Sequence, residues 1–146
     1  MADEKIPGII RDFLKALEAK DGDKVLSFFA EDGDWTIPEG VFKGKEELKH
    51  YLNWMLPLFQ GGKITECGNG IITQGNKAYV EFMVTGTVMG KKVEYLEMAA
   101  WEFSDDKIKH VRRVSDRLLI CKQAARGWLQ KWVVNYIVKQ VEKGLH

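Results

Sequence analysis

The first third of the chain places apolar residues at three- and four-residue spacing, which predicts amphipathic helices. One stripe predicts a helix that ends near Lys20 and consists of Ile6, Ile9, Ile10, Phe13, Leu14 and Leu17. A second stripe, after Lys45, comprises Leu48, Tyr51, Leu52, Met55 and Phe59. Pro57 is expected to end or kink this second helix, because proline lacks the backbone N–H that a helix needs.

Between these two helices the sequence predicts a short helix and a short strand. Asp23 is a suitable N-cap for a helix over residues 24–30, because its carboxylate can accept a backbone N–H of the first turn. Residues 34–37 can form a strand only as far as Pro38, which cannot donate to a ladder.

From Lys63 onward the pattern alternates with period two, which predicts four strands over residues 64–73, 78–88, 93–103 and 108–118. Short turn signals separate them at residues 74–76, 89–91 and 104–106, so the strands should form an antiparallel meander. Helices followed by a meander give an α+β fold with the helices over one sheet face. No linker or repeat divides residues 1–146, so a single domain is expected.

After Leu118 the period returns to that of a helix, over residues 122–144. Its apolar stripe consists of Cys121, Ala125, Trp128, Trp132 and Tyr136. A stripe of this kind must be buried against something. It could cover the mouth of a pocket, pack on the outer sheet face, or contact a second copy of the chain.

Composition narrows the range of functions. The chain has 146 residues, of which 45% are hydrophobic and 29% charged, with a formal net charge of +1. This balance is typical of a globular domain and argues against nucleic acid as a partner. The charged N-terminus and the lack of a long apolar run predict neither a signal peptide nor a membrane partner.

The few cysteines and histidines predict no metal site. Cys67 and Cys121 make no disulfide framework, so we expect a cytoplasmic protein. The three histidines have no ligand spacing with these cysteines, and the acidic loops at Asp21 and Asp32 lack the later ligands of a calcium loop. We therefore expect no metal and no cofactor.

A charged row across the sheet is the main candidate for chemistry. Residues two apart share a sheet face, and the turns near Gly90 and Asp105 are expected to bring Glu81, Ala99 and Arg113 into one row. Strands lie about 4.8 Å apart, so an arginine can lean over a small alanine to reach a carboxylate. The alternative is a structural ion pair on a partly wet or dimer-facing sheet.

Further side chains are candidates for the wall of a pocket. Glu97 lies one step along the same predicted face, and Trp35 and Trp101 would suit a flat apolar ligand. Tyr51, Tyr79 and Tyr95 could each offer a hydroxyl. Core packing of the tryptophans and backbone bonding of the tyrosines are the alternatives.

Three stretches of the chain resemble a known superfamily. They are the helix–Asp-Gly-Asp–helix start, the run Pro38, Gly40 and Gly44, and the ending IKHVRRVSD. Together, over residues 9–118, they resemble the SnoaL-like, ketosteroid isomerase-like and limonene epoxide hydrolase-like proteins of the nuclear transport factor 2-like superfamily. The resemblance implies a cone-shaped curved antiparallel sheet wrapped by N-terminal helices, with the helix after residue 121 as an addition. It also implies an internal pocket and a homodimer.

The catalytic groups of these relatives are mostly absent from the matching positions. The aspartates of ketosteroid isomerases would fall on Ile37 and Ala99, and the His and Asp of SnoaL-like cyclases on Ala99 and Arg113. The Arg-x-Asp pair of limonene epoxide hydrolases would fall on Tyr79 and Glu81, and their second Asp on Arg113. Only a carboxylate at Glu81 is kept.

Two functions follow as hypotheses. The first is cofactor-free acid–base chemistry, of hydrolase, isomerase or cyclase type, on an apolar oxygenated compound. Glu81 would be the acid or base, and Arg113 would steady an oxyanion or hold Glu81 in place. The substrate would be bound by Trp35, Tyr51, Tyr79, Glu97, Ala99 and Trp101. The second is a non-catalytic ligand-binding or dimerisation module that has lost the catalytic groups of the family.

Overall fold

The computed structural model describes residues 2–143, with side chains from residue 5 onward other than that of Phe59. The helices are α1 (Ala2–Glu18), α2 (Gly22–Ser27), α3 (Gly44–Met55), the 3-10 helix η1 (Leu56–Leu58), α4 (Arg117–Ala124) and α5 (Gly127–Val141). The strands are β1 (Phe29–Ile37), β2 (Gly40–Lys43), β3 (Phe59–Gln74), β4 (Lys77–Val88), β5 (Lys91–Ser104) and β6 (Lys107–Ser115). One end of the predicted C-terminal helix, residue 144, lies outside the described residues.

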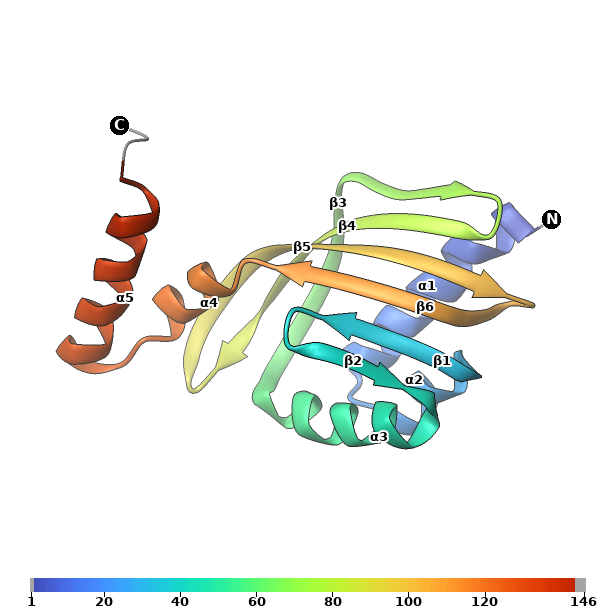
Figure 1. Cartoon of the computed structure of the whole chain (residues 1–146), viewed down its shortest axis with the longest axis horizontal. Helices are drawn as coiled ribbons and strands as arrows, with labels where there is room; N and C mark the ends of the chain where they lie inside the picture. Colours follow the sequence, from blue (N-terminus) through green and yellow to red (C-terminus); the bar gives the residue numbers. More distant parts are fainter. Residues whose placement is uncertain (1, 144–146) are drawn as a thin grey trace.

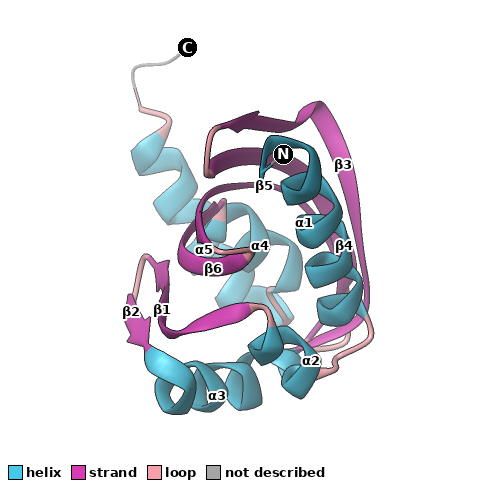
Figure 2. Cartoon of the chain, turned by 90° about the vertical axis from the view of Figure 1, so that its right-hand side faces the viewer, coloured by secondary structure: helices cyan, strands magenta, loops and turns pink. Residues whose placement is uncertain are grey.

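The strands form one curved, unclosed sheet in the order β2-β1-β6-β5-β4-β3 (Figure 1). The consecutive strands β3 to β6 pair antiparallel, which confirms the predicted meander, while β1 pairs parallel with β6. Helices α1, α2 and α3 lie on the inner side of the curve (Figure 2). The predicted fold class, an α+β cone with an added C-terminal helix, is confirmed.

The core fills the space between the helices and the inner sheet face. The stripe on α1 supplies Ile6, Ile10 and Phe13, which are at most 2% exposed. Trp35 and Trp101 come from the sheet and pack with Phe13 at ring distances of 5.5 and 5.0 Å. Both tryptophans are therefore part of the aromatic core.

Several element boundaries differ from the sequence expectation. The N-cap of α2 is Asp21, whose carboxylate accepts the Lys24 N–H at 2.9 Å, not Asp23. Pro57 lies in η1, directly after α3 ends, and Phe59 opens β3 instead of continuing α3. Asp116 ends β6 early by capping α4 through the Leu119 N–H, at 2.8 Å.

The predicted helix over residues 122–144 is broken into α4 and α5. Ala125 and Arg126 have extended backbone conformations, and Gly127 has a φ of 65°, which glycine adopts without strain. The break turns α5 away from the sheet (Figure 1). Within the described residues, no helix is both long enough and apolar enough to cross a membrane.

The largest correction concerns the facing of β4. The hairpin between β4 and β5 has a two-residue turn, Met89–Gly90, so Val88 pairs with Lys91 and Glu81 pairs with Met98. A three-residue turn would have put odd-numbered residues opposite each other; a two-residue turn reverses this parity. Val80, not Glu81, therefore stands beside Ala99 on the inner face.

Candidate functional site

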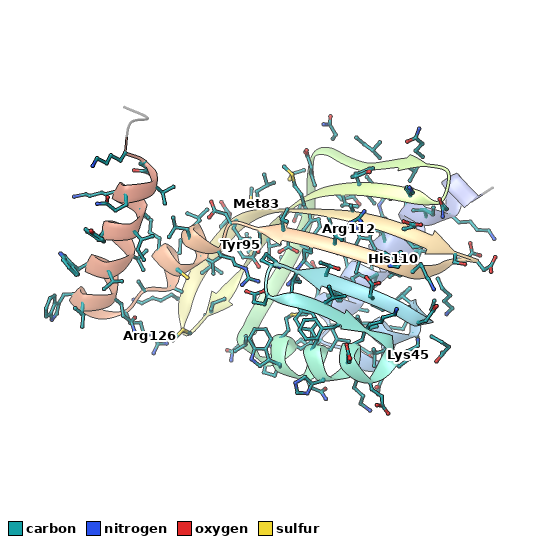
Figure 3. All side chains as sticks on the ribbon, viewed as in Figure 1. Lys45, Met83, Tyr95, His110, Arg112 and Arg126 are labelled. Carbon is teal, nitrogen blue, oxygen red and sulfur yellow. The ribbon has the colours of Figure 1, made fainter. Side chains whose placement is uncertain are left out.

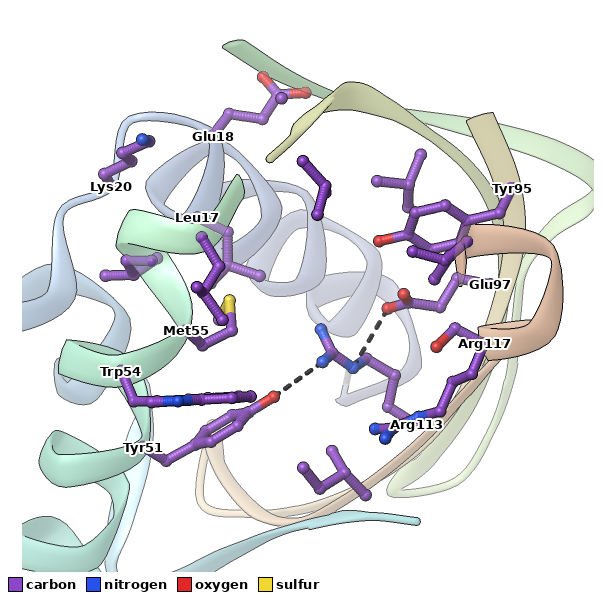
Figure 4. Close-up of a pocket in the computed structure, with 18 of the residues that line it drawn as sticks. Leu17, Glu18, Lys20, Tyr51, Trp54, Met55, Tyr95, Glu97, Arg113 and Arg117 are labelled. Carbon is purple, nitrogen blue, oxygen red and sulfur yellow. Dashed lines mark hydrogen bonds and ion pairs between the residues drawn. The ribbon is translucent and has the colours of Figure 1, made fainter. Parts of the chain in front are cut away.

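A cavity of about 330 Å³ lies between the helices and the inner sheet face. Its volume falls in the range of small-molecule sites. The walls come from the ends of α1 and α3, from η1, from strands β4, β5 and β6, and from α4 (Figure 4). Its apolar lining includes Leu17, Met55, Leu56, Val84, Val88 and Ile120.

Sheet register explains which polar side chains enter this cavity. Tyr95 and Glu97 are alternate residues of β5 and share its inner face. On β6, Arg113 pairs with Ala99 and Ser115 pairs with Glu97, so both point inward as well. The expected neighbourhood of Ala99 and Arg113 is thus confirmed.

Glu97, Arg113 and Tyr51 form a connected polar group at the inner end of the cavity (Figure 4). Glu97 is 3% exposed, and its Oε1 lies 3.4 Å from Nε of Arg113. Nη2 of Arg113 donates a hydrogen bond of 2.7 Å to the hydroxyl of Tyr51. The guanidinium also lies over the Trp35 ring, 5.3 Å from its centroid, in cation–π geometry. Arg113 is thus held from three sides.

Burial controls the protonation of this group. It raises the pKa of Glu97, and the attraction of Arg113 offsets only part of that rise. Burial likewise raises the pKa of the Tyr51 hydroxyl, against the influence of Arg113. The pKa of Tyr95 is also raised, chiefly by burial. The cavity therefore contains a carboxyl that holds its proton well and two phenols that remain hydrogen-bond donors.

The other predicted site residues lie elsewhere. Glu81 is on the outer sheet face, where Oε2 accepts the Asn69 N–H at 3.2 Å, and Tyr79 is 55% exposed on the same face. Their expected position beside Arg113 is wrong, because of the parity of the β4–β5 turn. Trp35, Ala99 and Trp101 are on the inner side but buried in the core.

Sequence reasoning missed part of the cavity wall. Trp54, Met55 and Leu56 belong to it, as do Ile120 and Cys121 of α4. The α4 residues were missed because Leu118 was placed in a strand. The Asp116 N-cap was the signal that could have found this helix, since aspartate is a favoured cap residue.

A family comparison accounts for this architecture. The family model of the SnoaL-like domain matches residues 10–111 of the 146. The chain belongs to the SnoaL-like domain family. The matched segment of this SnoaL-like chain contains Tyr51, Tyr95 and Glu97, and Arg113 follows two residues after it. No curated protein matches it in sequence.

Solved structures share the SnoaL-like fold at low sequence identity. A hypothetical protein from Catenulispora acidiphila with a ketosteroid isomerase-like fold, in complex with trimethylamine, is 13% identical with a TM-score of 0.72. The similarity covers 80% of this chain and 91% of that one. An epoxide hydrolase from M. tuberculosis, described as LEH-like, is 17% identical with a TM-score of 0.71, over 94% and 99% of the two chains.

A third structure, of TerC co-crystallised with polyporic acid, is 18% identical with a TM-score of 0.70. The similarity covers 80% of this SnoaL-like chain and 95% of TerC. At these identities the likeness concerns the fold.

Proposed function

We propose that this chain binds an apolar, oxygenated small molecule in the cavity and acts on it by acid–base chemistry, of hydrolase, isomerase or cyclase type. The observation that carries the proposal is the buried carboxyl of Glu97. It opens onto an apolar cavity, its pKa is raised, and it lies 3.4 Å from a fixed cation. Buried carboxyls of this kind are typical of general acids and bases.

The polar groups have distinct roles in this proposal. Glu97 replaces Glu81 as the proton-transfer group, giving a proton to a substrate oxygen or taking one from a neighbouring carbon. Arg113 stabilises the negative charge that develops on that oxygen. Tyr51 positions Arg113, and Tyr95 offers a second donor from the opposite wall. No cofactor is part of the proposal.

Structural relatives support the class of compound. One neighbour is described as an LEH-like epoxide hydrolase, and another was co-crystallised with polyporic acid. Both descriptions involve small organic compounds that carry oxygen. The apolar walls around Val84, Met55 and Ile120 suit the carbon skeleton of such a compound.

Binding without catalysis is the second candidate function. It is favoured by Ile37 and Ala99, which stand where the resemblance places the carboxylates of ketosteroid isomerases. In this case Arg113 would bind an oxygen of the ligand, and Glu97 would serve as the counterion of Arg113.

A pair of matched variants tests where the ligand binds. Ile120 lies on the cavity wall, whereas Val41 is 56% exposed on β2 and does not line the cavity. Thermal-shift screening of terpenoid epoxides, steroids and aromatic polyketides should find compounds that stabilise the wild type and Val41→Trp but not Ile120→Trp. Equal binding by both variants would show that the ligand does not bind in the cavity.

Turnover then separates the two candidate functions. The hits are incubated with the wild type, and products are followed by mass spectrometry. Conversion supports the acid–base proposal, and stable binding of every hit without conversion supports the binding module.

The proposal includes a homodimer in the cytoplasm. The outer sheet face exposes apolar side chains, including Tyr79, Met98 and Val114, which supports association of two copies. Cys67 and Cys121 are both free thiols, as suits a reducing compartment.

A further inference from the structure

Helix α5 exposes an unusual amount of apolar surface. It extends away from the sheet and contacts α4 (Figures 1 and 3). Its exposed large side chains are Trp128, Leu129, Trp132, Val133, Tyr136, Ile137 and Val141, with exposures from 42% to 79%. Exposure of this much apolar surface to water is unfavourable, and large exposed apolar patches mark interaction sites. The surface of α5 is therefore expected to bind a partner.

The distribution of these side chains indicates that the partner is a protein. Within α5, Val134 and Val138 alone are partly buried, and apolar side chains also occupy the sides that face away from them. A helix that lies on a membrane surface needs a polar face opposite its apolar face. A helix that is apolar on most sides is instead buried within protein.

The same chain has an apolar surface that nothing covers among the described residues. On the outer sheet face, Ile72 pairs with Tyr79, and Tyr79 pairs with Ala100. The adjacent row consists of Glu81, Met98 and Val114. These rows line an open groove of about 360 Å³, and Tyr79, Met98 and Val114 are 43% to 59% exposed. We call these two rows the outer patch.

We propose that α5 of one copy packs on the outer patch of a second copy, and that the second copy returns the same contact. Two such contacts related by a twofold axis close the assembly at a dimer. The extended residues Ala125 and Arg126 and the positive φ of Gly127 already hold α5 clear of its own body, as an exchanged arm requires.

The dimensions fit a stable dimer. A helix of 15 residues is about 22 Å long, and strands lie about 4.8 Å apart, so α5 spans the four strands β3 to β6. Half the surface of such a helix is roughly 350 Å². Two arms and two receiving patches would then bury about 1,400 Å², within the range of specific interfaces.

The charges are compatible with this arrangement. Over residues 127–141, α5 carries Lys131 and Lys139 and no acidic residue. The groove of the outer patch contains one charge of each sign: the carboxylate of Glu81, which accepts the Asn69 N–H, and Arg112, which pairs with Ala100. The two charges cancel, so the patch does not repel the lysines of α5, and Glu81 can pair with one of them. In this arrangement Glu81 contributes to the contact between the two copies and not to the cavity.

Sedimentation equilibrium of the full chain tests the arm exchange with two matched pairs of variants. Met98→Lys places a charge in the outer patch, and Met89→Lys makes the same change at an exposed turn. Trp132→Lys alters α5, and Val41→Lys alters an exposed apolar residue of β2 that lies outside both the cavity lining and the outer patch. All four positions are exposed in the single chain, and circular dichroism checks that each variant folds.

We expect the wild type, Met89→Lys and Val41→Lys to be dimers at micromolar concentration, and Met98→Lys and Trp132→Lys to dissociate at least tenfold more readily. This inference deepens the proposed homodimer, and the experiment separates the two. A dimer that survives Trp132→Lys overturns the arm exchange but leaves the homodimer intact. A monomeric wild type overturns both, and its Trp132-dependent binding to phosphatidylglycerol vesicles would identify lipid as the occupant. None of these outcomes bears on ligand binding in the cavity.

Discussion

Among single residues, Glu97 is central to the proposed function, because its carboxyl is buried beside the Arg113 cation. A neutral Glu97 can protonate a substrate oxygen, and an ionised Glu97 can remove a proton from carbon. The positive charge of Arg113 favours the ionised form of Glu97, and burial favours the neutral form. In the proposed mechanism, the same carboxyl both donates and accepts the transferred proton.

The pH dependence of stability tests this environment. Because burial raises the pKa of Glu97, the folded chain binds this proton more tightly than the unfolded chain, whose glutamates titrate near pH ~4.3. The contribution of Glu97 to the free energy of unfolding therefore falls as the pH rises from about 4.3 through the raised pKa. Glu97→Gln, which resembles the protonated form, should remove this fall.

The measurement is the melting temperature of the wild type and two variants between pH 4 and 8. The Tm of Glu97→Gln relative to the wild type should increase across this window. Glu81→Gln, on the outer face, is the matched control and should not show that increase. A constant difference for Glu97→Gln would mean that burial does not raise the pKa of this carboxyl.

Tyr51 is expected to contribute through its hydrogen bond to Arg113. Tyr51→Phe leaves a buried cation with one partner fewer, and hydrogen bonds to charged groups contribute about 1.5–3 kcal/mol. Urea unfolding should show a loss of this size. Tyr79→Phe, on the exposed outer face, should change stability by less than about 0.5 kcal/mol. Equal effects of the two changes would contradict the assigned role of Tyr51.

Among the elements, strand facing determines which residues reach the cavity. Two-residue periodicity in the sequence correctly grouped Glu97 with Ala99, and the turn after β5 was correctly expected to place Arg113 beside them. The facing of β4 could not be predicted in the same way. Met89-Gly90-Lys91 is compatible with turns of two or three residues, and the choice reverses every side chain of the strand.

An irregularity in β1 likewise sets the facing of Trp35. The β1–β6 register shifts between Phe29 and Asp34, and Gly33 lies in this segment. A Cβ on Gly33 would stand 2.7 Å from the backbone oxygen of Ile108 and 3.1 Å from that of Ala30. Backbone atoms of two strands cannot move aside easily, so this position requires glycine.

Gly33→Ala should therefore destabilise the chain by about 2 kcal/mol or more in urea unfolding. Gly8, within α1, is the control, because a Cβ there meets no atom within 4 Å. Gly8→Ala should stabilise by about 0.5–1 kcal/mol, since alanine has the higher helix propensity. A neutral effect at Gly33 would show that the strand adjusts.

For the whole molecule, the order of helices and strands was sufficient to predict an α+β fold, and the family resemblance implied its cone shape. The match to the SnoaL-like domain over residues 10–111 agrees with it. The position of α4 and the projection of α5 were not predictable, because the apolar stripe after Leu118 predicts burial without naming its partner. The cavity itself depends on α4, which brings Ile120 and Cys121 to its wall.

The secondary-structure elements could be predicted from the sequence, whereas strand facing and the position of the terminal helices could not, and this difference has a physical cause. Hydrophobic periodicity and turn residues are local properties, so they can be recognised in the sequence alone. Register across a hairpin and the docking of a terminal helix depend on contacts between distant residues. Of the predicted site residues, Arg113, Glu97 and Tyr51 therefore line the cavity, whereas Glu81 and Tyr79 lie on the outer sheet face.

Turnover is the direct test of the proposal that proton transfer in this SnoaL-like chain takes place at Glu97 inside the cavity. The rate constant for conversion of the best ligand from the screen is measured for the wild type, Glu97→Gln and Glu81→Gln at saturating ligand. We expect a loss of about 100-fold or more for Glu97→Gln, the usual size of a general acid–base contribution, and a change of less than about twofold for Glu81→Gln. Full activity in Glu97→Gln, or loss in Glu81→Gln alone, would contradict this proposal.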